Sequence, residues 1–262
     1  MTRGFDRTRT RRPVPQRLPE AAMSAWYTTP LGRRVLHIEQ RELDAVLPYL
    51  FGYQLVQLGR TPEELFQASR IRHKAVMDIA SPSEMSTDPT GPGLRSLVGR
   101  PEALPLSPDS VDVLLLPHVL EFAESPHDVL READRSLIPE GHLVVLGFNP
   151  WSLWMLWRWA RGRRGGMPWS GRFYSSVRLR DWLALLGFDI VLTRYYFFQP
   201  PLHHEAIMNR CGFAERIGRR AWPVLGAGYL LVARKRVTTL TPIRPRWRPR
   251  RRFAPAGVTS PE

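Results

Sequence analysis

The sequence predicts an α/β fold in which a parallel sheet carries helices on both faces. Two short runs, residues 111–116 and 142–148, are apolar at successive positions, as expected of strands buried on both faces. A helical pattern with an apolar stripe lies between them, over residues 126–137. Two parallel strands joined by a crossover helix form a right-handed βαβ unit. Ligands of such sheets bind beyond the carboxyl ends of the strands, here residues 116–118 and 147–149.

The crossover helix has clear start and stop signals. Ser125 can serve as its N-cap, and Pro126 occupies the first helical position, where no backbone N–H is needed. Asp128 places a negative charge in the first turn, where it interacts favourably with the helix dipole. Residues 139–141, with the sequence Pro-Glu-Gly, separate the helix from the second strand.

The elements on either side of this unit continue the alternation of strands and helices. Before it we expect a helix over residues 32–50, a strand over 53–59, a short helix opened by Pro62, a strand over 74–79, a loop over 81–93 and a strand over 94–98. After it we expect a Trp- and Arg-rich helical segment over 151–164, a helix over 177–186, a strand over 188–198, an irregular stretch over 200–227 and a last strand over 229–233.

The composition fits a globular protein with basic termini. The chain has 262 residues, of which 43% are hydrophobic, and its single cysteine excludes a disulfide framework and favours a reducing cytosol. We expect a disordered basic extension over residues 1–22, one domain over 23–240 with a Trp/Arg-rich insertion at 150–172, and a disordered basic tail over 241–262. No apolar run approaches the roughly 20 residues of a transmembrane helix, so no transmembrane segment is predicted.

The net charge of +14 is concentrated in three segments. Residues 1–22 carry +4, residues 158–172 carry +5 and residues 241–262 carry +5, which leaves the rest of the chain neutral. Such localised charge indicates an anionic partner, either nucleic acid, a membrane surface or an acidic protein, although a solvated surface without a partner is an equal alternative. The Trp-rich segment itself can be a lid over the site, a helix in a membrane interface or a core helix.

Five strings in the central stretch form a recognisable pattern. They are EALPL at 102–106, SVDV at 110–113, HVLE at 118–121, LREADRSL at 130–137 and PEG at 139–141. Together they resemble the class I S-adenosylmethionine-dependent methyltransferases, in particular the type 11 branch. The strings LREADR and GFNP are also similar to a bacterial subgroup with a basic C-terminus. The resemblance implies a Rossmann-like seven-stranded sheet with helices on both faces, S-adenosyl-L-methionine as cofactor and an unidentified methyl acceptor.

The resemblance also implies where the cofactor would bind. The turn after the first strand would face its methionine part, an acid at the end of the second strand would hold its ribose hydroxyls, and the turn after the third strand would contact adenine. The corresponding candidates are Gln57, Leu58, Gly59, Asp78, Arg100, Pro101, Glu102 and Pro117.

Several of these positions depart from the family pattern. Gly59 is the one glycine left of a glycine-rich turn, and Arg60 adds bulk where that turn is normally thin. Arg100 stands where the family has a carboxylate that accepts from the adenine amine, whereas a guanidinium only donates. Pro101 lacks a backbone N–H. We therefore expect a degenerate cofactor motif and weak cofactor binding.

Two residues at strand ends are candidates for catalysis. His118 can accept a proton or contact the cofactor, with a capping or packing histidine as the alternative. Asn149 can orient an amide or hydroxyl of the acceptor, with a turn residue before a helix as the alternative. No metal site is predicted, because the adjacent residues His203, His204 and Glu205 lack further ligands at metal-binding spacing.

Three functional hypotheses follow. The first is a cytoplasmic methyltransferase that uses S-adenosylmethionine on an unknown acceptor. The second is a catalytically degenerate relative that binds nucleic acid, an anionic membrane or an acidic partner through its basic segments. The third is a protein that acts near lipids, held peripherally at the inner face of the membrane.

Overall fold

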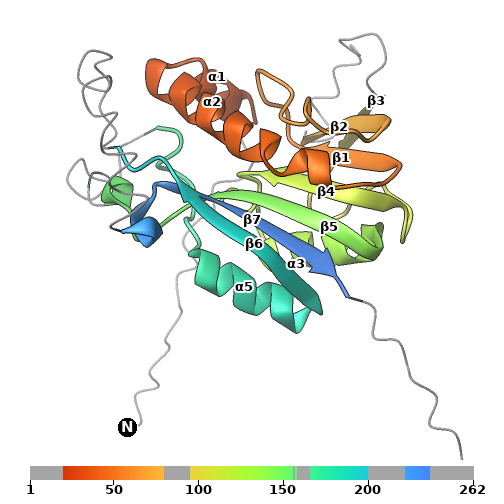
Figure 1. Cartoon of the computed structure of the whole chain (residues 1–262). Coiled ribbons are helices and arrows are strands. Elements are labelled where there is room, and N and C mark those ends of the chain that lie inside the picture. Colours follow the sequence, from red (N-terminus) through yellow and green to blue (C-terminus); the bar gives the residue numbers. More distant parts are fainter. Residues whose placement is uncertain (1–19, 80–94, 156, 158–165, 200–221, 237–262) are drawn as a thin grey trace, which may run out of the picture.

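A computed structural model shows a central sheet with helices on both faces, and it describes residues 20–79, 95–155, 157, 166–199 and 222–236 (Figure 1). The strands are β1 Gln54–Leu58, β2 His73–Ile79, β3 Arg95–Gly99, β4 Val111–Pro117, β5 Leu137–Phe148, β6 Phe188–Tyr196 and β7 Gly228–Lys235. The helices are α1 Glu20–Tyr27, α2 Pro30–Asp44, α3 Pro126–Ser136 and α5 Ser176–Leu185, with 3-10 turns η1 Leu47–Tyr49 and η2 Pro223–Leu225.

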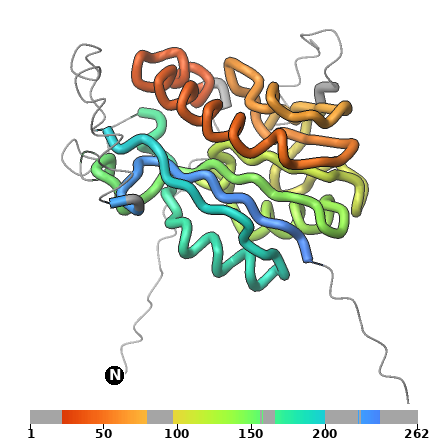
Figure 2. The backbone as a smooth tube through the Cα atoms, viewed as in Figure 1, coloured from red at the N-terminus to blue at the C-terminus, as the bar shows by residue number. Residues whose placement is uncertain are grey.

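The seven strands lie in the order β3-β2-β1-β4-β5-β7-β6. All neighbouring strands are parallel except β7, which runs antiparallel to both β5 and β6. The predicted βαβ unit is therefore confirmed as β4, α3 and β5. From β1 the chain path moves outward to β3 and then returns to β4 beside β1 (Figure 2). The order thus reverses between β1 and β4, the point at which open α/β sheets bind ligands.

Alternation along the central strands divides the core into two layers. In β4, Val113 and Leu115 pack in the cluster that contains α1 and α2, whereas Leu114 and Leu116 pack in the cluster that contains α3 and α5. This follows from the two-residue period of a strand, whose successive side chains point to opposite faces. Figure 1 shows α1 and α2 on one side of the sheet and α3 and α5 on the other.

Side-chain caps fix the starts of the helices. Ser125 accepts a hydrogen bond from the backbone N–H of Asp128, with Pro126 at the first position of α3, as the sequence predicts. Thr29 caps α2 in the same way, by accepting from the N–H of Gly32 at 3.1 Å. Ser175 caps α5.

The structure corrects three of the predicted elements. The helix expected over residues 32–50 ends at Asp44, because Pro48 cannot supply a helical N–H and the chain continues as η1. No helix follows Pro62, where Thr61 Oγ1 donates to the carbonyl of Glu63 and so competes with helical bonding. The strand expected over residues 142–148 begins already at Leu137, so residues 139–141 lie within β5 and do not separate it from α3.

Several predictions fall on parts of the chain outside the described residues. They include the disorder of the two termini, the loop at 81–93, residues 158–164 and the segment around His203. Of the helices that are described, none is long and apolar enough to cross a membrane.

Candidate functional site

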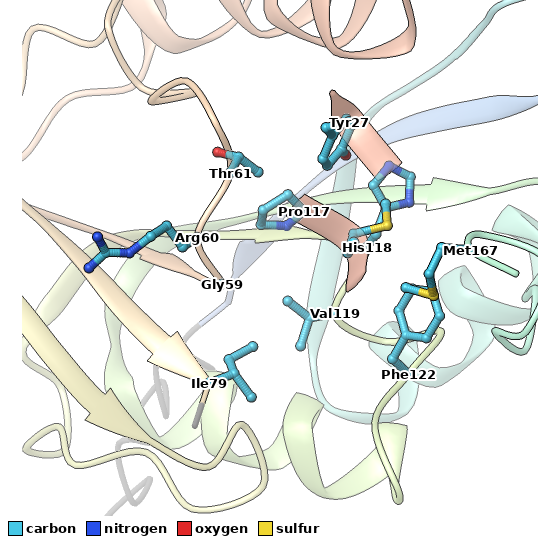
Figure 3. Close-up of a pocket in the computed structure, with 11 residues that line it drawn as sticks. Tyr27, Gly59, Arg60, Thr61, Ile79, Pro117, His118, Val119, Phe122 and Met167 are labelled. Carbon is cyan, nitrogen blue, oxygen red and sulfur yellow. The ribbon is translucent and has the colours of Figure 1, made fainter. Parts of the chain in front are cut away.

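A pocket opens at the point where the strand order reverses (Figure 3). It lies beyond the carboxyl ends of β1, β2 and β4 and is closed on one side by α1. Its lining residues are Met23, Tyr27, Gly59, Arg60, Thr61, Ile79, Pro117, His118, Val119, Phe122 and Met167. Most of these are apolar, as is typical of small-molecule sites.

The turn after β1 forms one wall of the pocket. Gly59 has a φ of +85°, a left-handed conformation that favours glycine, and its N–H donates to the carbonyl of Met77. Gln57 lies behind the turn, where its Nε2 donates to the carbonyl of Gly59 at 2.9 Å and to Thr61 Oγ1 at 3.1 Å. The predicted candidates Gln57 and Leu58 are both buried and hold the turn, and Gly59 reaches the pocket.

Asp78 lies near the end of β2 and is paired with Arg60. Arg60 Nε donates to Asp78 Oδ1 at 2.9 Å, and its second guanidinium nitrogen donates to Asp78 Oδ2 at 2.7 Å. This is a bidentate arrangement that engages both oxygens of the carboxylate. The predicted ribose-binding acid is thus beside the pocket, with its oxygens held by the neighbouring strand's turn.

His118 is the centre of a buried polar cluster at the opposite wall. Its Nε2 lies 2.8 Å from Glu39 Oε1 of α2, and its Nδ1 lies 3.2 Å from Glu121 Oε1. Glu39 also accepts from the hydroxyls of Tyr27 and Tyr196, each at 3.0 Å. All five side chains are buried, so this cluster connects α1, α2, the segment after β4 and the end of β6.

The two carboxylates control the protonation of His118. Burial by itself lowers its pKa, but the negative charge of Glu39 and the hydrogen bonds that the ring donates to both carboxylates outweigh burial and raise the pKa to about 9. Burial and the nearby Glu39 likewise raise the pKa of Tyr27 and of Tyr196, so both hydroxyls remain protonated donors. At neutral pH His118 is therefore an imidazolium whose two ring nitrogens both donate.

Asn149 is buried and bonded to backbone. Its Nδ2 donates to the carbonyls of Val224 at 2.7 Å and Gly226 at 2.9 Å, and its Oδ1 accepts from the N–H of Trp151. These contacts join the segment after β5 to the segment before β7. Asn149 is not among the residues that line the pocket.

The turn after β3 also lies outside the pocket lining. Arg100 is exposed and lies 4.0 Å from Glu102 and 3.7 Å from Glu124. Glu102 accepts a hydrogen bond from the N–H of Glu124, and Pro101 is buried. The structure therefore places Gly59, Pro117 and His118 in the pocket lining and Asp78 beside it, bonded to the lining residue Arg60. Arg100, Pro101, Glu102 and Asn149 lie away from the lining.

Sequence reasoning missed four members of the buried cluster: Tyr27, Glu39, Glu121 and Tyr196. Glu39 carried a usable signal, because it lies between Leu36 and Leu43 at the spacing of the apolar stripe of α2. A charged residue on the buried face of an amphipathic helix indicates a buried polar partner. Within the described ranges, no group of three or more potential ligands could hold a metal ion.

Comparisons with known proteins agree with the fold. Residues 59–145 match the family model described as a methyltransferase domain. The chain is 31% identical over 232 residues to the uncharacterised protein YafS of Escherichia coli, which covers 87% of this chain and 88% of that protein. It is also 29% identical over 205 residues to the uncharacterised protein Rv2003c of Mycobacterium tuberculosis, covering 74% and 69% of the two chains.

Two solved structures show the same fold. A methyltransferase of Thermotoga maritima described as S-adenosylmethionine-dependent superposes with a TM-score of 0.57 at 20% identity, covering 81% of this chain and 93% of that one. A second such methyltransferase, from Mesorhizobium loti, gives a TM-score of 0.51 at 16% identity over 74% and 96% of the two chains.

Proposed function

The chain belongs to the class I S-adenosylmethionine-dependent methyltransferases, and on this premise we propose that it transfers the cofactor's methyl group to an acceptor bound beside His118. The observation that carries the proposal is the pocket at the reversal of the strand order, between the ends of β1, β2 and β4. Nucleotide-containing ligands of open α/β sheets bind at this position.

The residues around the pocket fit this cofactor. Gly59 lets bare backbone approach a ligand, and Asp78 offers a carboxylate near the end of β2, where such sheets hold ribose hydroxyls. When bound, S-adenosylmethionine supplies a methyl group on a positively charged sulfur. The chain then has mainly to bind and orient the reacting groups and to exclude water, for which the apolar side chains of Val119, Phe122 and Met167 are suited.

We propose that His118 holds in place the wall of the pocket beside which the methyl acceptor binds. It does not itself take a proton from that substrate. Both ring nitrogens face carboxylate oxygens, and the raised pKa keeps the ring protonated at neutral pH. Its contacts hold α2 against the segment after β4. The backbone bonds of Asn149 support a structural role for that residue as well.

Calorimetric titration of the full chain with S-adenosylmethionine and S-adenosylhomocysteine tests the proposal. We expect both to bind, and Asp78→Asn to weaken both, because it removes the charged acceptor for the ribose hydroxyls. Arg100→Asp should leave binding unchanged, since Arg100 does not line the pocket. If neither compound binds the wild-type chain, the proposal is contradicted and the alternative of a catalytically degenerate binding protein is favoured.

We also propose that the protein binds an anionic membrane surface. Five exposed apolar side chains lie on the two segments that Asn149 joins, namely Trp151, Leu153, Trp222, Val224 and Leu225. Aliphatic side chains insert between lipids but do not stack on bases, which favours lipid over nucleic acid. A cytoplasmic location at the inner membrane face is a prediction that accompanies this proposal.

A further inference from the structure

Arg60 occupies an unusual place at the edge of the pocket. It follows Gly59 in the turn after β1 and lines the pocket, while its guanidinium reaches across to the next strand. Figure 3 shows Arg60 extending from the turn on the side away from Phe122 and Met167. The guanidinium nitrogens lie 2.9 and 2.7 Å from the two oxygens of Asp78. One turn of the candidate cofactor site is therefore bonded to another part of the same site.

Asp78 is the acid that a ribose would require. It lies beside the pocket near the carboxyl end of β2, and it follows Gly59 by about 20 residues, the spacing at which nucleotide-binding sheets place the acid that accepts from ribose hydroxyls. Two adjacent hydroxyls can donate to the two oxygens of one carboxylate. A planar guanidinium makes the same two-pronged contact. Arg60 and a ribose therefore compete for the same face of Asp78.

We propose that Arg60 sets the affinity of the protein for its cofactor by competing with the cofactor's ribose for Asp78. This inference rests on the proposed cofactor site. Binding of a ribose releases the guanidinium, which is 41% exposed and can return to water without being buried unpaired. Binding of the ribose also breaks the ion pair between Arg60 and Asp78, and this loss opposes binding. Asp78 is 21% exposed, so the pair is partly screened by water, and its loss weakens binding by a limited factor.

The test measures whether removing Arg60 helps ligands only when they carry ribose hydroxyls. The full chain and its Arg60→Gly variant are titrated with S-adenosylhomocysteine, adenosine and dideoxyadenosine, which lacks both hydroxyls. Exposed ion pairs contribute little, so we expect Arg60→Gly to bind the first two compounds roughly two- to fivefold more tightly. Dideoxyadenosine should bind equally to both proteins, because it has no ribose hydroxyls that could donate hydrogen bonds to Asp78.

A matched control separates this effect from a general change of charge. Arg72→Gly removes an exposed arginine at the other end of β2 and should leave all three affinities unchanged. An equal gain for dideoxyadenosine in Arg60→Gly would mean that bulk in the turn, and not competition, controls affinity, and would overturn the proposal. Unchanged or weaker binding of S-adenosylhomocysteine by Arg60→Gly would overturn it too, while leaving the proposed function intact. If neither protein binds S-adenosylhomocysteine, both proposals fail.

Salt gives an independent readout. Adenosine is neutral, so its own contacts respond little to ionic strength, whereas salt screens a partly exposed ion pair. Raising the salt concentration from about 0.05 M to about 1 M should therefore tighten adenosine binding to the wild-type chain and have no such effect on Arg60→Gly. An identical salt response in the two proteins would contradict the competition.

Discussion

His118 has a backbone φ of +54°, in the left-handed region that few residues other than glycine adopt readily. Several contacts hold it there. Its N–H donates to the carbonyl of Leu146, its ring stacks on Phe148 at 3.9 Å between centroids, and both ring nitrogens meet carboxylates. One position thus fixes the end of β4, the neighbouring strand β5 and helix α2. Sequence reasoning placed His118 at the site but could not show that its nitrogens are already engaged.

The raised pKa of His118 makes the stability of the protein depend on pH. The pKa is about 9 in the folded chain and about 6.5 when unfolded, so the stabilisation is fully present below about pH 6.5 and is lost as the pH rises through about 9. The shift corresponds to about 3 kcal/mol. Urea unfolding between these pH values should show this loss in the wild type. His118→Asn, which tolerates the left-handed backbone, should lack the slope, and equal slopes would contradict the assignment.

Glu39 is the carboxylate that does most to raise the pKa of His118. Glu39→Gln should therefore lower that pKa, because a neutral amide keeps a hydrogen bond but removes the charge. NMR titration of the His118 ring protons measures the change. Glu42→Gln is a suitable control, since Glu42 is buried on the same helix but lies near Arg194. A His118 pKa unaltered by Glu39→Gln would show that Glu121 alone controls the ring.

Among the secondary-structure elements, β1 and β4 are joined at their starts by one side chain. Asp112 Oδ2 accepts from the backbone N–H groups of Tyr53 at 3.0 Å and Gln54 at 2.9 Å. Hydrogen bonds to a charged acceptor contribute about 1.5–3 kcal/mol, so Asp112→Ala should lower the free energy of unfolding by about that amount. The change lies at the opposite strand ends from the pocket, and binding of S-adenosylhomocysteine should survive. Asp181→Ala, on the exposed face of α5, is the control and should cost less than about 0.5 kcal/mol.

The local signals of the sequence predict the central elements well because those signals are strong. The cap at Ser125, the proline after it and the apolar strands on either side specify β4 and α3 to within one residue, whereas β5 begins five residues before the predicted residue 142. The region after β1 was predicted less well. There Pro62 and two acids favour a helix, but the hydrogen bonds of Thr61 give turns instead. These hydrogen bonds form only when the chain around Gly59 is folded, so the helix propensity of the local sequence does not predict them.

For the molecule as a whole, the meeting of the strand ends at the pocket was predictable and the contribution of α1 to the pocket was not. Gly59 and Asp78 follow strand ends, so the parallel order of the sheet brings them together. One wall of the pocket is formed by α1, whose residues Met23 and Tyr27 line it. The contribution of Met23 and Tyr27 to the pocket depends on how α1 and α2 pack over the sheet. Neither periodicity nor a motif in the sequence records that packing.

The charge of the molecule leads to the last prediction, which concerns membranes. The chain carries +14, with five arginines and no acid over residues 158–172 and six arginines over 241–262. Each basic residue near an anionic lipid surface contributes about 1 kcal/mol, an attraction that salt screens. We therefore expect binding to vesicles that contain phosphatidylglycerol, weakening as salt rises. Deleting residues 241–262 should reduce both the affinity and its salt dependence, as measured by vesicle flotation.

The apolar contribution to membrane binding can be separated from the charge. Trp151 is 73% exposed, whereas Trp154 is 1% exposed and belongs to the core, so Trp151 is the residue to replace. Trp151→Ala should weaken vesicle binding with little change in its salt dependence, because it removes interfacial anchoring and no charge. Phe51→Ala is the matched control: Phe51 is 68% exposed but precedes β1, at the opposite end of the parallel strands from Trp151. Equal losses in the two variants, or RNA binding in a gel shift without vesicle binding, would contradict a lipid surface as the partner of this edge.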